Sequence, residues 1–359
     1  MADPVLEVAL SMLTLVPGGM GGSETYAREL THLLMGVEDV HTIAYVPAMA
    51  SGFSQGVDEQ VVRGVRGGIS SAQRLRAVAS ATLRARRIRL LMKDADVVHF
   101  PFTVPVPRPA HGQAMVQSLL DVQHLDLPQL FSRPELAYRS QFYDRAARAA
   151  DSVITISNFA KERMIELLGL PADKITVAQL GVDCNQFTPN LGVREDFVMY
   201  PARGWQHKNH ARLIEAMNLV RRERPEMRLV LTGGALDSLG ELPDWVDRRG
   251  LVSVDELRDL YRRAAVLAFP SIYEGFGLPP LEAMASGCPV AASDSGSIPE
   301  VCGDAAVLFD ALDVEAIAAG ILDAIARSSE LTQLGLKQVR RFTWERCRDT
   351  HLEVYRSFA

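Results

Sequence analysis

The chain has 359 residues, which is long for one hydrophobic core and typical of two domains. Its apolar content of 48% and charged content of 23% are ordinary for a globular protein, and its net charge of −6 gives no electrostatic basis for nucleic-acid binding. The four cysteines show neither a CxxC pair nor metal-ligand spacing, so we expect reduced thiols in a cytoplasmic protein.

The beginning of the chain, MADPVLEVALSML, has no basic segment before its apolar run. We therefore interpret it as a first β-strand and not as a signal peptide. No run reaches the roughly 18 apolar residues that predict a membrane span.

The N-terminal half alternates short apolar runs with helical patterns, which predicts βαβ units and a mostly parallel sheet. The expected strands are 5–13, 41–46, 95–100, 114–120 and 152–157.

A similar series of strands is expected at 196–202, 227–234, 265–270 and 289–293. Between the two series, residues 181–196 contain Pro, Gly and Asn and are typical of a linker. We therefore predict an α/β protein with two Rossmann-like domains, residues 1–190 and 191–342, and ligands at the carboxyl ends of the strands. The tail, 343–359, has a helical pattern.

The first predicted strand leads into a glycine-rich segment, PGGMGGSETYARELTHLL (17–34). Its glycines permit tight turns, and Ser23 with Glu24 is typical of a helix N-cap region. Such a loop is either a flexible βα turn or a site where the backbone amides of Gly21 and Gly22 approach a ligand.

Residues 60–93 contain nine basic residues and no acidic residue. This composition is compatible with contact to anionic lipid or to a polyprenyl-diphosphate acceptor. On a helical wheel the arginines scatter and form no clean polar face, so ordinary solvated charge is an equal alternative.

The segment SIYEGFGLPPLEAMASG (271–287) predicts a loop that runs directly into a short helix. Gly275 and Gly277 let a ligand approach the main chain, and the two following prolines suit the first turn of a helix. Free amides at that helix start favour an anion such as phosphate. Glu274 precedes the loop and Glu282 is expected in the first helical turn. Carboxylates at both ends of a phosphate-sized concavity suit a sugar nucleotide.

The spacing of Glu274 and Glu282, with seven residues between them, resembles the signature of the retaining glycosyltransferases of family 4. The resemblance extends to four further blocks in the order found in that family, at 157–189, 200–216, 250–261 and 268–309, the second containing an HKN sequence. It implies the GT-B fold, in which two Rossmann-like domains face each other across a cleft and the final helix packs back onto the first domain.

The resemblance assigns roles to residues of the second half. Glu282 is expected to bind the ribose hydroxyls of the donor, and Glu274 is expected to face its hexose. The backbone of Gly275, Phe276, Gly277 and Leu278 would contact sugar and phosphate, while the turn that contains Leu251 would contact the base.

The leaving diphosphate requires positive charge, which the resemblance assigns to Arg203 and Lys208. The family usually has these two cations six positions apart, whereas here they are five apart. Lys208 aligns securely, and Arg203 is either a phosphate ligand or a solvated surface residue. His207 and Asn209 are expected to position or cap this loop.

In the first half, the resemblance brings Gly21 and Gly22 against the donor phosphate or the acceptor. The segment 118–132 is similar to an acceptor-side segment in which many relatives have a histidine before the aspartate. Here that position is Leu120, followed by Asp121. His124 either replaces the missing histidine at the reacting centre or caps the following helix.

Asp94-Ala95-Asp96 looks like the metal-binding DxD motif of other glycosyltransferases, but it leads directly into a predicted strand. Acidic residues commonly end such a turn, and the GT-B fold does not use this motif for a metal. We therefore expect no metal and no other cofactor.

The expected activity is retaining transfer of a hexosyl unit from a nucleoside diphosphate sugar to an acceptor hydroxyl. GDP-mannose is the first candidate donor, and a carbohydrate or polyprenyl-linked molecule is the expected acceptor. Two alternatives stay open: a nucleotide-sugar epimerase of the same fold and a non-catalytic sugar-nucleotide-binding module.

Overall fold

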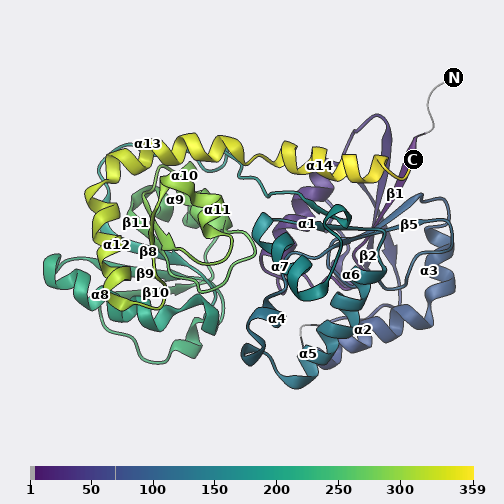
Figure 1. Cartoon of the computed structure of the whole chain (residues 1–359), viewed down its shortest axis with the longest axis horizontal. Helices are drawn as coiled ribbons and strands as arrows, with labels where there is room; N and C mark the ends of the chain where they lie inside the picture. Colours follow the sequence, from purple (N-terminus) through teal and green to yellow (C-terminus); the bar gives the residue numbers. More distant parts are fainter. Residues whose placement is uncertain (1–4, 69) are drawn as a thin grey trace. The chain divides into compact units, whose positions relative to one another are not determined.

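A computed structural model describes residues 5–68 and 70–359, which form two compact units (Figure 1). The first unit runs to Gln179 and also contains Trp344–Ala359, and the second unit is Leu180–Thr343. Residues 180–190, which the sequence analysis grouped with the first domain, therefore belong to the second unit.

Two contacts explain why residues 180–190 group with the second unit. The backbone amide of Val182 donates to the carbonyl oxygen of Phe342 at 3.2 Å. The ring of Phe187 packs edge-on against Tyr261 with centroids 6.0 Å apart. The segment thus has hydrophobic and backbone partners of its own and does not behave as a solvated linker.

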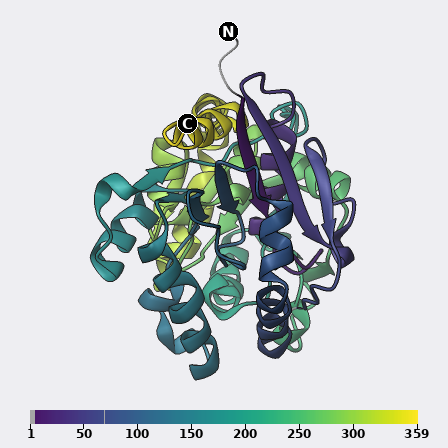
Figure 2. The same cartoon turned by 90° about the vertical axis from the view of Figure 1, so that its right-hand side faces the viewer.

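The first unit is built on a seven-stranded parallel sheet in the order β3-β2-β1-β4-β5-β6-β7. In Figure 2 its purple strands run side by side. The order reverses between β1 and β4, as in a doubly wound fold. The strands are β1 (Leu6–Ser11), β2 (Val40–Pro47), β3 (Asp58–Val62), β4 (Val97–Phe100), β5 (Ala114–Ser118), β6 (Ser152–Thr155) and β7 (Ile175–Val177).

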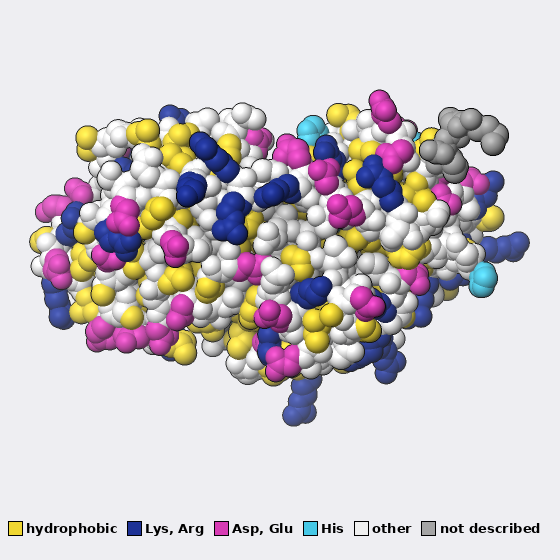
Figure 3. Space-filling model, turned by 45° about the horizontal axis from the view of Figure 1, so that its top comes forward, with side chains coloured by type: hydrophobic (Ala, Val, Ile, Leu, Met, Phe, Trp, Pro, Cys, Tyr) yellow, Lys and Arg dark blue, Asp and Glu magenta, His cyan; other side chains and the backbone are white. Residues whose placement is uncertain are grey.

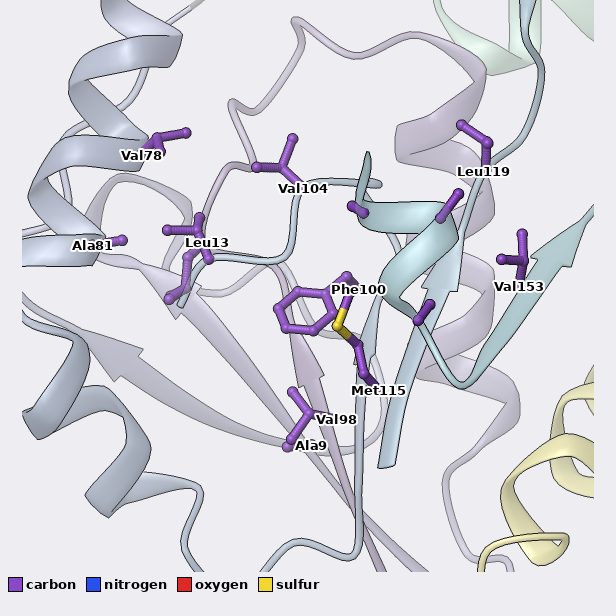
Figure 4. Close-up of a cluster of buried hydrophobic side chains, with 14 of the residues drawn as sticks. Ala9, Leu13, Val78, Ala81, Val98, Phe100, Val104, Met115, Leu119 and Val153 are labelled. Carbon is purple, nitrogen blue, oxygen red and sulfur yellow. The ribbon is translucent and has the colours of Figure 1, made fainter. Parts of the chain in front are cut away.

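Helices connect these strands and bury one face each against the sheet or a neighbouring helix. They are α1 (Gly22–Leu33), α2 (Ser71–Leu83), α3 (Ala85–Leu91), α4 (Gln123–Asp126), α5 (Arg133–Arg139), α6 (Arg145–Ala149) and α7 (Asn158–Leu168). Figure 4 shows part of the core beneath them, where Phe100 and Met115 meet side chains of Ala9 and Val98.

The last helix, α14 (Trp344–Arg356), belongs to the first unit and packs on α1, β1 and β7. Part of its attachment is polar and fully buried. Nδ1 of His351 lies 2.7 Å from the carbonyl oxygen of Cys347, so this nitrogen carries the proton. Nε2 is then an acceptor, and the hydroxyl of Tyr26 donates to it at 2.7 Å.

The direction of these bonds fixes the rest of the network. Because the Tyr26 proton is used, the hydroxyl of Ser118 donates to Tyr26 at 2.7 Å. Nε2 of His99 then donates to Ser118 at 2.7 Å, and Tyr355 donates to Nδ1 of His99 at 2.6 Å. Both histidines are therefore neutral, and burial lowers the pKa of each, that of His351 to about 4.

The second unit is built on a six-stranded parallel sheet in the order β10-β9-β8-β11-β12-β13. This order also reverses once, between β8 and β11. The strands are β8 (Glu195–Pro201), β9 (Arg228–Thr232), β10 (Val246–Gly250), β11 (Ala264–Phe269), β12 (Val290–Ser293) and β13 (Val307–Phe309). The helices are α8 (His210–Glu223), α9 (Val254–Arg263), α10 (Leu278–Ala285), α11 (Ile298–Cys302), α12 (Val314–Ala326) and α13 (Ser328–Gln338).

The nine strands expected from the sequence are all present, and four additional ones are β3, β7, β10 and β13. All four are edge strands. Edge strands have a side exposed to solvent, so sequences such as DEQVV in β3 and VDRRG in β10 carry polar residues and no continuous apolar run.

The surface and the helices add two observations on partners. On the face shown in Figure 3, basic and acidic side chains are interspersed. Within residues 5–68 and 70–359, no helix has both the length and the apolar character needed to cross a bilayer.

Candidate functional site

The expected site residues of the second unit gather where the strand order of its sheet reverses. β8 and β11 are parallel neighbours, and the loops that leave their carboxyl ends contain Arg203 to Asn209 and Pro270 to Gly277. In open parallel sheets this reversal point leaves a crevice at the strand ends because consecutive connections depart to opposite faces. The fold therefore brings the two sequence blocks together.

Lys208 and Glu274 form an ion pair at this point, with Nζ 2.5 Å from Oε1. Their side chains are 15% and 13% exposed, so the pair is shielded but open to a ligand. The hydroxyl of Tyr200, in β8, donates to the carbonyl oxygen of Lys208 at 2.7 Å and fixes its main chain. A cation and a carboxylate held this close present both charges to one small ligand.

Asn209 anchors the loop that carries Lys208. This residue adopts a left-handed conformation (φ 61°), which asparagine tolerates better than most residues. Its buried side-chain amide donates to the carbonyl oxygens of Pro270 (3.1 Å) and Ala311 (2.7 Å). Asn209 thus ties the loop after β8 to the loop after β11, which agrees with the expected positioning role.

Arg203 lies on the same loop and is half-buried. Its guanidinium lies 5.4 Å from the ring centroid of Trp205, and the Trp205 ring lies 5.6 Å from that of His207. This stacking holds Arg203 against the loop and stabilises a cation at the edge of the site. The arginine is therefore packed, and its contact with phosphate stays a prediction.

The main chain of Glu274 is held by residues that sequence reasoning did not single out. The hydroxyl of Ser297 lies within hydrogen-bond distance of the carbonyl oxygens of Glu274 (2.9 Å) and Phe276 (2.6 Å). Gly296 has φ +64°, and a Cβ there would lie 2.9 Å from the Glu274 carbonyl oxygen. Both residues follow β12 in the block 268–309, but nothing in their sequence pattern points to Glu274.

The loop ends at Gly277, which has φ +119° and directly precedes the first residue of α10, Leu278. A Cβ at Gly277 would lie 2.7 Å from Cδ1 of Ile298, so only glycine fits without a shift. The Phe276 side chain is buried against Phe342, with ring centroids 5.9 Å apart, so only its backbone is available to a ligand. Gly275 and Leu278 are both half-buried.

Glu282 lies on α10 and accepts a hydrogen bond from the hydroxyl of Tyr261 at 2.8 Å. It is the fifth residue of the helix, whereas the sequence analysis expected it in the first turn. This position makes a helix-dipole role weak, because that effect decays within the first turn. Burial raises the pKa of Glu282, while the Tyr261 hydrogen bond and the charge of Arg258 oppose the rise.

Leu251, in the expected base-contacting turn, is 80% exposed directly after β10. The amide of Gly233 donates to the carbonyl oxygen of Gly250 at 2.7 Å, which joins this turn to the loop after β9. The guanidinium of Arg249 binds the carboxylates of Asp247 (2.8 Å) and Glu256 (3.1 Å). The turn therefore offers backbone and one apolar side chain.

Gly21 and Gly22 lie in the first unit, where Gly21 (φ 59°) precedes α1 and Gly22 is its first residue. The loop is closed by Glu24, whose carboxylate accepts from the amide of Gly18 at 2.9 Å. It is thus a hydrogen-bonded turn at the carboxyl end of β1. Contact of these glycines with a donor or acceptor stays a prediction.

His124 is 1% exposed and lies in the core of the first unit. Its Nε2 is 2.9 Å from Oδ1 of the buried Asp144, and the rings of Phe131 and Tyr143 pack edge-on against the imidazole. Asp144 is placed there by a π-helical turn, Ser140–Asp144. In this position the imidazole of His124 is buried and paired with Asp144, and its role at a reacting centre stays a prediction.

The DxD-like motif has a structural role. Asp96 accepts the backbone amide of Glu7 at 2.9 Å, and Asp94 is exposed beside Lys93. Across residues 5–68 and 70–359, no three His, Cys, Asp or Glu side chains gather as metal ligands would. None of the four cysteines forms a disulfide.

Two family models match the chain, one for each unit. The model described as Glycosyltransferase Family 4 matches residues 20–186, and the model described as Glycosyl transferases group 1 matches residues 195–327.

Two curated relatives are mannosyltransferases. O-antigen chain mannosyltransferase B of Escherichia coli is 30% identical over 273 residues, which cover 69% of this chain and 71% of the relative. The MMP alpha-(1->4)-mannosyltransferase of Mycolicibacterium hassiacum is 32% identical over 227 residues, which cover 59% of this chain and 55% of that protein.

Solved structures share the fold. Sucrose-phosphate synthase from Thermosynechococcus elongatus has a TM-score of 0.77 at 19% identity, with 98% of both chains covered. Anabaena HepE in complex with UDP-glucose has a TM-score of 0.72 at 17% identity, with 98% of this chain and 100% of that chain covered. The predicted GT-B fold with two Rossmann-like domains is confirmed by this likeness and by the two parallel sheets.

Proposed function

This chain belongs to glycosyltransferase family 4 of the group 1 glycosyl transferases, and from that membership we propose that it transfers a hexosyl unit from a nucleoside diphosphate sugar to an acceptor hydroxyl. The proposed stereochemical outcome is retention at the anomeric carbon, without a metal. The relatives named mannosyltransferases support GDP-mannose as the first donor to test. We propose a carbohydrate or polyprenyl-linked acceptor and a cytoplasmic location.

The observation that carries the proposal is the Lys208–Glu274 pair at the reversal point of the second sheet. In the proposed complex, the diphosphate binds the Lys208 ammonium, and the hexose hydroxyls donate hydrogen bonds to the Glu274 carboxylate. Each of the two side chains thus exchanges its present partner for atoms of the donor, so neither is left buried and unpaired. The backbone amides of Gly277 and Leu278 would supply further donors to phosphate, since Pro279 and Pro280 have no N–H.

Glu282 would bind the ribose from the other side of the loop. The hydroxyl of Tyr261 binds Oε2 of Glu282, which leaves Oε1 for a ribose hydroxyl. Leu251 and the backbone of its turn would contact the base, and Arg203 would join Lys208 on the diphosphate.

The chemistry proposed for these residues is charge stabilisation and positioning. As the glycosidic bond breaks, negative charge gathers on the departing diphosphate, and Lys208 with Arg203 lowers the barrier by being in place beforehand. The departing phosphate oxygen itself takes the proton of the acceptor hydroxyl as the new bond forms on the same face. No side chain of the protein is assigned as a covalent nucleophile.

A thermal-shift screen against UDP-, GDP- and dTDP-sugars tests donor binding. A ligand present at 100 times its dissociation constant stabilises the folded protein by about 2.7 kcal/mol. We expect one nucleotide series to shift the wild-type protein and to lose its effect in Lys208→Ala.

A product assay with the stabilising donor separates the alternatives. Transfer to an acceptor supports the proposal, an epimerised sugar formed without acceptor indicates an epimerase, and binding without turnover indicates a non-catalytic module. Absence of a shift with every donor series would contradict the proposed site.

A further inference from the structure

Helices α2 and α3 of the first unit have apolar side chains on the face that points to solvent. Ala77, Val78 and Ala81 of α2 are buried. At about 100° per residue, Leu83 lies on the opposite face, and it is 85% exposed. On α3, the buried residue is Ile88, and Leu90, which is nearly opposite, is 60% exposed.

Arginines flank these leucines. Arg76 on α2 and Arg86 and Arg87 on α3 are all exposed. None of the three forms an ion pair with a carboxylate of residues 5–68 or 70–359. Arg74, by contrast, turns toward α5 and lies 3.5 Å from Glu135. The structure therefore separates arginines with a structural partner from those presented outward, a distinction that the helical wheel alone did not make.

Exposed leucines between unpaired arginines are unfavourable for a face that meets only water. They suit the boundary between lipid headgroups and acyl chains, where apolar side chains enter and guanidinium groups reach the phosphates. We propose that the outer face of α2 and α3, defined by Leu75, Arg76, Leu83, Arg86, Arg87 and Leu90, docks on an anionic lipid bilayer (Figure 1).

Charge complementarity favours a bilayer over a protein partner. The face carries Arg76, Arg86 and Arg87, and residues 60–93 contain no acidic residue that would offset their charge, so the face matches an extended anionic surface. The contact is peripheral, since no helix of the described part of the chain is able to span a membrane. The inference rests on the first unit alone and is independent of the chemistry proposed for the second.

Flotation of the full chain with vesicles tests the docking face. The vesicles are phosphatidylcholine alone or phosphatidylcholine with phosphatidylglycerol, each at low and high salt. We expect binding only to the anionic vesicles and release by salt, because surface charge is screened.

Two variants test the residues. In Arg76→Gln/Arg86→Gln/Arg87→Gln, we expect partitioning to fall about 100-fold, since each basic residue near an anionic surface contributes roughly a fivefold factor. In Leu83→Ser/Leu90→Ser, we expect a loss of at least about tenfold that high salt does not mimic. The matched controls, Arg222→Gln/Arg228→Gln/Arg340→Gln and Leu191→Ser/Leu312→Ser, change exposed residues of the second unit and should bind as wild type.

Several outcomes would overturn the proposal. These are absence of binding to anionic vesicles at low salt, equal binding to neutral vesicles, or equal losses in the test and control variants. Release by soluble inorganic pyrophosphate at constant ionic strength would instead indicate a single diphosphate site, and the bilayer proposal would fail.

Discussion

Lys208 and Glu274 are 66 positions apart in the sequence, and their side chains meet at 2.5 Å because the strands before them, β8 and β11, are neighbours in the sheet. The sheet thus sets the distance between the two charges, and the loops only carry them. This relationship leads to two separable expectations, one for catalysis and one for stability.

For catalysis, we expect Lys208→Ala and Glu274→Ala to abolish nearly all transfer while the fold is retained. Removal of one preplaced charge-stabilising group typically lowers kcat by about 100- to 1,000-fold. Steady-state kinetics with circular dichroism as the fold control measures this, and Arg222→Ala is the matched exposed cation. Turnover like that of wild type in both variants would contradict the site assignment.

For stability, we expect coupling between Lys208 and Glu274 in the protein without added donor. Each single alanine variant leaves the other charge partly buried and unpaired, which costs about 1–3 kcal/mol. The double variant should lose less than the sum of the two single losses. A double-mutant cycle from urea unfolding measures the difference, and strict additivity would show that the pair contributes nothing to stability.

Gly296 and Ser297 contact the main chain of Glu274, and variants of these two residues test whether that contact is needed for activity. A Cβ at Gly296 would press on the main chain of Glu274, so we expect Gly296→Ala to lower kcat/KM strongly. Ser297→Ala removes the hydroxyl proton that the carbonyl oxygens of Glu274 and Phe276 share, and should lower kcat/KM more moderately. Gly112→Ala is a matched control, because Gly112 also has positive φ but has open space around its Cβ position. If Gly112→Ala reduces kcat/KM as much as Gly296→Ala does, the pressure on Glu274 is not the cause.

We expect the Glu282 carboxylate to lower the stability of the fold while it contributes to nucleotide binding. Burial raises the pKa of Glu282 in the folded state above the ordinary 4.5. Its contribution to the free energy of unfolding is therefore fully present at low pH and is lost as pH rises through the folded pKa. Glu282→Gln removes this dependence. We expect the variant to be more stable than wild type near pH 8, to lose that advantage near pH 4, and to bind nucleotide poorly.

Urea midpoints across this pH range, together with nucleotide titrations, measure both effects of Glu282→Gln. Glu241→Gln is the exposed control and should match wild type throughout. A variant that is less stable than wild type at high pH would show that the Glu282 carboxylate is favourable where it lies.

The buried histidines predict acid sensitivity of the first unit. The pKa of His351 falls to about 4 in the folded state from an ordinary 6.5, so the unfolded chain binds more protons between these values. Stability should therefore fall as pH drops from about 6.5 to 4, by up to roughly 1.4 kcal/mol per pH unit for each such histidine. His351→Gln should reduce this slope by about one proton, and the exposed His111→Gln should leave it unchanged. An unchanged slope in His351→Gln would contradict the assigned tautomers.

The sequence predicted the fold because its central strands are buried on both faces and so appear as apolar runs. Among the edge strands, β3 and β10 were missed because they carry polar residues, and β7 and β13 were missed because each has only three residues. In the second unit, the motif blocks identified Lys208, Glu274 and Glu282, and the sheet brings the loops of the first two together. Ser297, Gly296 and Tyr261 could not be found this way, because each acts by contact with a residue that is distant in the sequence.

His124 shows what a sequence pattern leaves open. Its position in the sequence suggested either a role at the reacting centre or a helix cap, and the structure places it in the core, paired with Asp144 of a π-helical turn. A role at the reacting centre stays a prediction. A sequence pattern does not reveal which way a side chain turns when its partner lies twenty residues away.

The bond between Tyr26 and His351 has a consequence for biosynthesis. A ribosome makes Tyr26 and His99 early, yet their partners His351 and Tyr355 emerge only with the final helix, after the whole second unit. Domains usually fold in the order of synthesis. Here the first unit is translated first but gains its last hydrogen bonds after the second unit is complete. A chain that stopped before Trp344 would have an incomplete first unit joined to a complete second unit.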